Sequence, residues 1–154
     1  MKRKIYNSLL DWKKNDASRT ALLIDGARRV GKSYIVNEFA RNEYKTHILI
    51  DFNRVSPDVK ELFERHLTDL DVFFSYLSAF FNVSLHPGES LIVFDEVQLY
   101  PKARAAIKYL VADGRYHFIE TGSLMSIAAN TEDIVIPSEE RHIKMYPLNF
   151  EEFL

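Results

Sequence analysis

Short, continuous apolar runs alternate along the chain with segments in which apolar residues recur every three or four positions. Continuous runs predict buried strands, and the helical period predicts amphipathic helices with one face in a core. The predicted strands are residues 20–25, 47–50, 91–94 and 116–119, with a fifth candidate at 143–146. The alternation favours right-handed crossovers and an α/β fold, a three-layer sandwich with a mostly parallel sheet.

Helix signals fill the intervals between these strands. The first 16 residues carry apolar positions on one helical face, and a second helix is expected to start near Ser33. Ser56 and Pro57 form a typical helix start, and Gly114 stands where a helix beginning at Pro101 would end. The helical pair between the second and third strands exceeds the needs of one crossover, and it is either an insertion or a packed cap. Four phenylalanines of this pair follow the helical period and are predicted to be core: Phe73, Phe74, Phe80 and Phe81.

The first strand leads directly into Gly26-Ala-Arg-Arg-Val-Gly-Lys-Ser33, which fits the phosphate-binding pattern G-x-x-x-x-G-K-[ST]. Glycines allow the backbone N–H groups to turn toward phosphate, and the following helix adds the positive end of its dipole. Lys32 is predicted to contact the β- and γ-phosphates, and the Ser33 hydroxyl to bind magnesium. The predicted nucleotide-binding residues are Gly26, Ala27, Arg28, Arg29, Val30, Gly31, Lys32, Ser33 and Tyr34.

The two arginines inside this loop, Arg28 and Arg29, allow several interpretations. They either contact phosphate, reach a neighbouring subunit, or are solvated surface charges.

The third strand ends in a pair of acidic residues, Asp95 and Glu96. Ligand sites gather at the carboxyl ends of parallel strands, so this pair is expected beside the glycine loop. We predict that Asp95 holds Mg²⁺ together with Ser33, and that Glu96 orients and deprotonates the attacking water.

The fourth strand has a polar end, Glu120-Thr-Gly-Ser123. Thr121 is the first candidate for a hydrogen bond to the γ-phosphate or to the attacking water. Ser123 is the second, unless it only caps the following helix. Gln98, just after the acidic pair, is a weaker candidate for the same site and fits a surface position better.

Composition narrows the choice of function. A chain of 154 residues with 47% hydrophobic and 27% charged residues fits one globular domain over 1–154. It has no cysteine, no signal peptide and no apolar stretch long enough for a membrane, so a cytoplasmic location is expected. The net charge of −2 gives no support for a nucleic-acid partner without excluding one. The five histidines lack the spacing of a metal site.

These motifs resemble those of prokaryotic AAA-like P-loop ATPases whose N-terminal domain carries a "GARRVGKS"-type loop. The likeness covers nearly the whole chain, including Trp12, Phe94-Asp-Glu-Val-Gln98, Thr121-Gly-Ser123 and Tyr146-Pro-Leu-Asn-Phe-Glu-Glu-Phe153. It implies an ATPase of the additional-glutamate type, with the catalytic strand inserted next to the P-loop strand. Ser33 stands where Thr is commoner in that family, and both residues offer a hydroxyl.

The resemblance also bears on the end of the chain. Relatives often have Gly-Arg before the closing segment, whereas here Glu140 precedes Arg141. Arg141 is therefore a tentative catalytic arginine, acting on the γ-phosphate of its own site or of a neighbouring subunit, or a solvated strand-edge residue. Asn149-Phe-Glu-Glu152 has the pattern of a helix start. Together with the family's usual C-terminal, nuclease-like domain, it predicts that the natural protein continues.

Three functions remain open from the sequence. The leading one is a magnesium-dependent ATPase that drives a conformational change in an attached domain or partner, in a homo-oligomer or alone. A nucleotide-gated switch with little hydrolysis is the second. A P-loop kinase is weaker, since Glu96 would activate water. No Asn-Lys-x-Asp or Thr-Lys-x-Asp motif occurs, which argues against a GTPase.

Overall fold

The computed structural model describes residues 2–26, 32–122 and 140–144. Within these ranges the strands and helices alternate as the hydrophobic pattern predicts. The strands are β1 (Ala21–Asp25), β2 (Thr46–Asp51), β3 (Ser90–Asp95), β4 (His117–Gly122) and β5 (Glu140–Lys144). The helices are α1 (Lys2–Asn15), α2 (Lys32–Glu43), α3 (Pro57–Arg65), α4 (Leu70–Phe81), the short 3₁₀ helix η1 (Val97–Leu99) and α5 (Pro101–Asp113).

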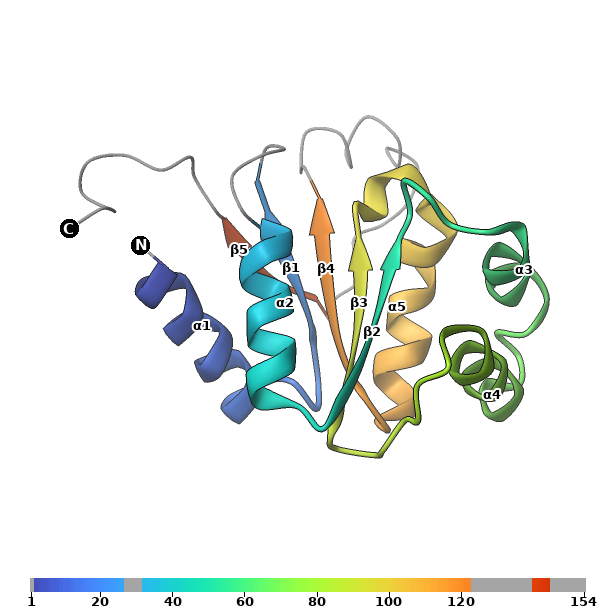
Figure 1. Ribbon diagram of the computed structural model, residues 1–154, viewed down its shortest axis with the longest axis horizontal. Helices are drawn as coiled ribbons and strands as arrows, with labels where there is room; N and C mark the ends of the chain where they lie inside the picture. The colour runs from blue at the N-terminus through green and yellow to red at the C-terminus, as the bar shows by residue number, and fades with distance from the viewer. Residues whose placement is uncertain (1, 27–31, 123–139, 145–154) are drawn as a thin grey trace.

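The five strands form one sheet in the order β2-β3-β4-β1-β5, and every neighbouring pair is parallel (Figure 1). β4 lies between β1 and β3. The acidic pair at the end of β3 is therefore two strands away from the end of β1. The carboxyl ends are aligned: Asp25 is in register with Gly122, and Asp51 with Asp95. All polar strand ends therefore lie along one edge of the sheet.

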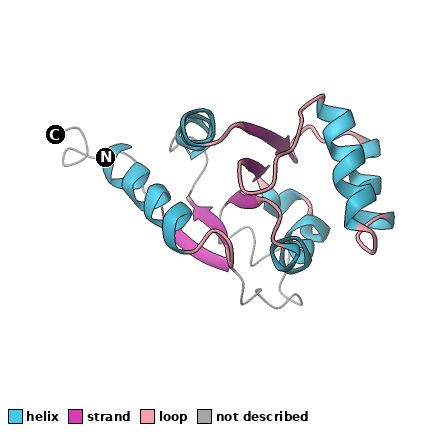
Figure 2. Cartoon of the chain, turned by 90° about the horizontal axis from the view of Figure 1, so that it is seen from below, coloured by secondary structure: helices cyan, strands magenta, loops and turns pink. Residues whose placement is uncertain are grey.

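Helices cover both faces of the sheet, as the views along and across it show (Figures 1 and 2). Leu22 and Ile24 of β1 pack in a core with α1 and α2. Leu23, between them, points to the opposite core with α3, α4 and α5. Because successive strand residues face opposite sides, a strand buried on both faces must be apolar throughout, as β1 is from Ala21 to Ile24. The three-layer α/β architecture is confirmed.

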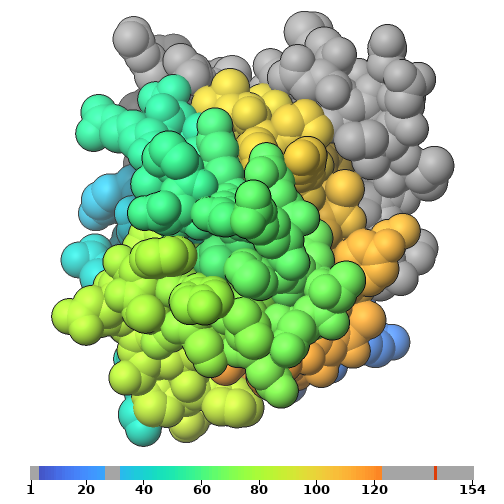
Figure 3. All heavy atoms as spheres, turned by 90° about the vertical axis from the view of Figure 1, so that its right-hand side faces the viewer, coloured from blue at the N-terminus to red at the C-terminus, as the bar shows by residue number. Residues whose placement is uncertain are grey.

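The pair α3–α4 packs against the sheet. The Phe63 ring lies 5.2 Å from the Phe73 ring and 5.5 Å from the Phe94 ring of β3, between ring centroids. The outer surface of this pair faces the viewer in Figure 3. Phe80 is an exception to the predicted core: it is 48% exposed and stacks on Tyr76. Helical spacing alone does not distinguish the two sides of a helix that is apolar nearly all round.

The ends of the helices follow the sequence signals. Ser56 caps α3, its Oγ accepting a hydrogen bond from the N–H of Val59 at 3.3 Å, and Pro57 is the first helical residue. Gly114 ends α5 with a φ of 81°, in the left-handed region that glycine adopts readily.

The fifth strand starts three residues earlier than predicted, at Glu140 instead of Ile143. Its first residues are charged or polar, which obscures the strand in the sequence. Among the described strands, β5 pairs with β1 alone and forms an edge of the sheet, and edge strands tolerate such residues.

A buried ring pair lies at the amino end of β4, opposite the polar edge. The Tyr44 hydroxyl is 2.6 Å from Nδ1 of His117, and the indole of Trp12 contacts the same imidazole. Burial lowers the pKa of His117, and the positive charge of Lys13 lowers it further.

Candidate functional site

The residues predicted to act on phosphate meet at the carboxyl edge of the sheet. Gly26 follows β1, Lys32 begins α2, and Asp95 ends β3. The N–H of Gly26 donates to the carbonyl of Gly122 at 3.0 Å, which continues the β1–β4 ladder to the start of the loop. Ala27 to Gly31 lie outside the described residues, so the contacts predicted for Arg28, Arg29 and the other loop residues stay predictions.

Lys32 is buried, with 3% of its surface exposed. Its Nζ donates to the carbonyl of Gly26 at 2.9 Å and to Oε1 of Glu96 at 3.1 Å. A buried ammonium requires such partners, because desolvation without them is costly. The amine is thus held at the mouth of the loop between β1 and the acidic pair.

Asp95 is the centre of the hydroxyl contacts. Its Oδ1 accepts one hydrogen bond from Ser33 at 2.9 Å and another from Thr121 at 2.6 Å. The two hydroxyls come from α2 and β4, so the carboxylate connects three elements. Asp95 is itself almost fully buried, and these charge-assisted bonds offset its desolvation.

Thr121 hydrogen-bonds both acidic residues. Its single hydroxyl proton goes to Asp95, and its oxygen accepts the N–H of Glu96 at 3.0 Å. The side chain is fully buried. Thr121 therefore orders the two acidic residues, and its contact with γ-phosphate or with the attacking water stays a prediction.

Glu96 has an unusual backbone. Its φ of 58° and ψ of 51° lie in the left-handed region, which costs a non-glycine residue roughly 1–2 kcal/mol. The bond from its N–H to Thr121 helps to hold this conformation. The turn directs the side chain back toward Lys32, and strain of this kind is common at functional positions.

Gln98 belongs to the site, although the sequence favoured a surface position. It lies on η1, is 6% exposed, and its Nε2 donates to Oε2 of Glu96 at 2.6 Å. The two oxygens of Glu96 are thus bound separately, Oε1 by Lys32 and Oε2 by Gln98. The sequence shows that Gln98 follows Glu96 by two residues. It does not show the left-handed turn at Glu96, which brings the two side chains into contact.

The side chains of Ser33 and Asp95 fit a magnesium ion. Magnesium prefers oxygen ligands, and in nucleotide sites it takes one or two from the protein and the rest from phosphate and water. A hydroxyl and a carboxylate 2.9 Å apart supply two such oxygens. Within the described residues no group of three or more His, Asp or Glu side chains forms a metal site of its own. Tyr34, also predicted to bind nucleotide, is 56% exposed on α2.

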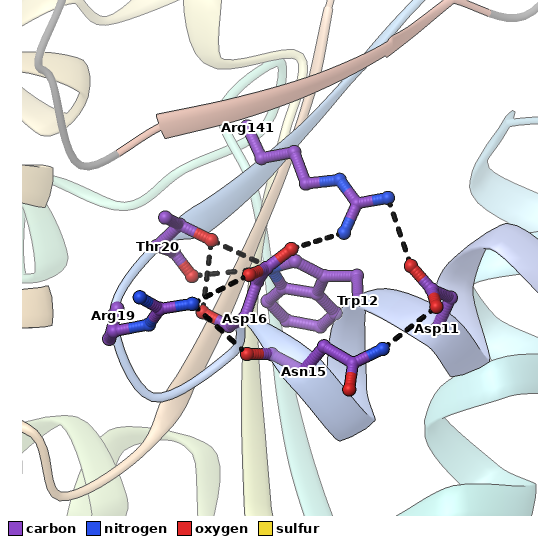
Figure 4. Close-up of polar contacts among 7 residues, drawn as sticks. All are labelled: Asp11, Trp12, Asn15, Asp16, Arg19, Thr20 and Arg141. Atoms are coloured by element: carbon purple, nitrogen blue, oxygen red, sulfur yellow. Dashed lines mark hydrogen bonds and ion pairs between the residues drawn. The ribbon is translucent and has the colours of Figure 1, made fainter.

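Arg141 lies apart from this cluster. Its guanidinium pairs with Asp16 and, at 3.2 Å, with Asp11 (Figure 4). On β5 it is in register with Leu22, three residues before the polar end of β1. The prediction that Arg141 acts on its own γ-phosphate is therefore not supported by its position. In this chain it ties β5 to α1.

Among the helices of the described ranges, none has both the length and the apolar character that crossing a bilayer requires.

Two solved structures are similar to this chain over part of their own length. Among solved structures, C. elegans PCH-2 is similar with a TM-score of 0.47 and 10% identity, over 96% of this chain and 42% of that one. The Pyrococcus furiosus Hef helicase domain gives a TM-score of 0.42 and 14% identity, over 93% and 38%. The chain thus spans about two fifths of each. No curated protein matches it at a significant level. The family model described as "AAA domain" matches residues 18–154, and the chain belongs to that family.

Proposed function

We propose that this domain binds ATP with Mg²⁺ and hydrolyses it. The observation that carries the proposal is the cluster of Lys32, Ser33, Asp95 and Glu96, which the start of α2 and the end of β3 bring within hydrogen-bond distance. Membership of the AAA family supports nucleotide binding at this edge.

The roles follow from the chemistry of each group. Lys32 places a positive charge where the β- and γ-phosphates of a nucleotide in the glycine loop would lie. Ser33 and Asp95 would hold the magnesium ion, which supplies positive charge to neutralise the phosphate oxygens. Glu96 is proposed to accept a proton from the attacking water, because its carboxylate lies beside Lys32, whereas that of Asp95 accepts the hydroxyls of Ser33 and Thr121.

Nucleotide binding has to change the contacts of Lys32. In the structure its amine is paired with Glu96, and the same amine is needed by phosphate. When Lys32 turns to the nucleotide, Oε1 of Glu96 loses its ion pair and becomes available to a water molecule. Binding thus uncovers the general base.

We propose ATP as the nucleotide, since the chain lacks the guanine-reading tetrapeptides. The work that hydrolysis drives is proposed to be a conformational change in an attached domain or partner, including other copies of the chain. A weakly hydrolysing switch and a kinase are the alternatives that the same experiment separates.

The test is single-turnover hydrolysis of Mg-ATP by wild type, Glu96→Gln and Lys32→Ala, with binding measured in parallel. We expect Glu96→Gln to bind ATP and to hydrolyse it roughly 10²–10⁴-fold more slowly. Lys32→Ala should bind weakly. Glu89→Gln, an exposed glutamate at the other end of β3, is the matched control and should behave as wild type.

Two outcomes would contradict the proposal. Equal, slow turnover in wild type and Glu96→Gln would indicate a switch. Transfer of the γ-phosphate to an acceptor other than water would indicate a kinase.

A further inference from the structure

We infer that Gln98 is a positioning residue that orients the carboxylate of Glu96 to take a proton from the water that attacks the γ-phosphate, and that this contact persists when Lys32 turns to the nucleotide. The inference rests on the proposed hydrolysis and adds a component to it. Its basis is the 2.6 Å hydrogen bond from Nε2 of Gln98 to Oε2 of Glu96.

The direction of this bond is fixed by chemistry. An ionised carboxylate only accepts hydrogen bonds, so the amide of Gln98 must present its NH₂ group. A donor to a charged oxygen forms a stronger bond than a neutral pair does. Gln98 therefore restrains Oε2 of Glu96, and Lys32 binds the other oxygen.

The donor is held by a rigid part of the chain. On η1, the N–H of Leu99 donates to the carbonyl of Glu96 at 3.1 Å, and the N–H of Tyr100 to that of Val97 at 3.0 Å. Val97 is completely buried in the core beneath. These contacts hold the backbone of η1 in place, so the position from which the Gln98 side chain extends is fixed.

The contacts of Glu96 with Lys32 and with Gln98 should respond differently to nucleotide. Lys32 binds Oε1 and would be drawn away by phosphate, whereas Gln98 binds Oε2 and has no charge that phosphate would attract. Without Gln98, Oε2 would lose this donor and the carboxylate would be less restrained. A base misplaced by about 1 Å can lose on the order of 10² in rate.

The experiment compares Gln98→Met with wild type. Methionine has nearly the same length and fills the same space without a donor, so the packing of η1 is retained. We expect single-turnover hydrolysis at saturating Mg-ATP to fall roughly tenfold to a hundredfold, with the Kd for Mg-ATP within about threefold of wild type. Leu99→Met, on the exposed side of the same short helix, is the control and should leave both unchanged.

A double-mutant cycle separates positioning from a general structural effect. If Gln98 acts through Glu96, Gln98→Met should have no further effect on the residual rate of Glu96→Gln. Multiplicative losses in the double variant would overturn the inference.

Crystal structures of nucleotide-free Lys32→Ala, with and without Gln98→Met, give a readout that does not need hydrolysis, because Lys32 then no longer holds Oε1. We expect the Glu96 side chain to keep its orientation where Gln98 is present, and to leave it or to occupy several in the double variant. An unchanged, single orientation in the double variant would overturn the positioning role. A wild type that hydrolyses no ATP would contradict the proposed function instead, and the crystallographic comparison would still decide whether Gln98 holds Glu96.

Discussion

The amine of Lys32 lies 3.1 Å from Oε1 of Glu96, so the proposed phosphate-binding cation and the proposed base form an ion pair. Both side chains are largely buried, at 3% and 14% exposure, which limits screening by water. In the proposed function ATP competes with Glu96 for Lys32, and this competition opposes binding.

Removal of the competing charge should therefore tighten nucleotide binding. We expect Glu96→Gln to bind Mg-ATP about twofold to tenfold more tightly than wild type, because the ion pair stabilises only the empty site. Isothermal titration calorimetry measures the change. An unchanged or weaker affinity in Glu96→Gln, with Glu89→Gln as the control, would show that the pair imposes no cost on binding.

The second prediction concerns the hydroxyl of Thr121. Thr121→Val keeps the shape of the side chain but leaves the buried N–H of Glu96 without its acceptor. We expect the free energy of unfolding to fall by about 1–3 kcal/mol, with a loss of hydrolysis as Asp95 and Glu96 shift. Denaturant titration and single-turnover assays provide the measurements.

Thr121→Ser is the matched variant for this position. It keeps the hydroxyl and removes one methyl group, so its free energy of unfolding should fall by about 0.8 kcal/mol while hydrolysis is retained. If Thr121→Val hydrolysed ATP as well as Thr121→Ser does, the hydroxyl would have no part in ordering the acidic pair.

Arg141 provides the third prediction. Its pairs with Asp11 and Asp16 are partly exposed, so Arg141→Met should lower the free energy of unfolding by only about 0.5–1 kcal/mol. Arg19→Met, the matched control, removes a more exposed partner of the same Asp16 and should lower the free energy of unfolding by less. Hydrolysis by Arg141→Met should equal wild type. A large loss would instead indicate that the arginine reaches the nucleotide of another copy.

The fourth prediction is a pH dependence of stability. Because burial lowers the pKa of His117 in the folded state, the unfolded chain takes up the proton first as the pH falls. The contribution of His117 to the free energy of unfolding should be complete above the ordinary histidine pKa of about 6.5. It should decrease as the pH falls below that value, toward the lower pKa of the folded state.

Denaturant titrations at several pH values test this dependence. His117→Gln should reduce the slope between neutral and acidic pH, and His47, whose pKa burial also lowers, should account for part of the remainder. An identical slope in wild type and His117→Gln would exclude His117 as a source.

The fold was largely predictable because its main signals are local. The apolar run of β1, the cap at Ser56 and the glycine at 114 each depend on neighbours in sequence, and each is confirmed. The start of β5 was not predictable, since its polar residues are tolerated only because of the strand's edge position.

Within the candidate site, the residue types were predictable and their mutual contacts were not. Motif spacing identified Lys32, Ser33, Asp95 and Glu96. The burial of Gln98 depends on the left-handed turn at Glu96, and the central place of Thr121 depends on β4 lying between β1 and β3. Neither the order of strands in the sheet nor the backbone conformation of one residue produces a hydrophobic pattern that can be recognised in the sequence.

The insertion of β4 also sets the width of the nucleotide site. Neighbouring strands lie about 4.8 Å apart, so β1 and β3 are separated by roughly 9–10 Å, with Thr121 between them. The side chains of Lys32 and Ser33, at the start of α2, cross this distance to reach Glu96 and Asp95. β4 thus acts as a spacer of fixed thickness between the two halves of the candidate site.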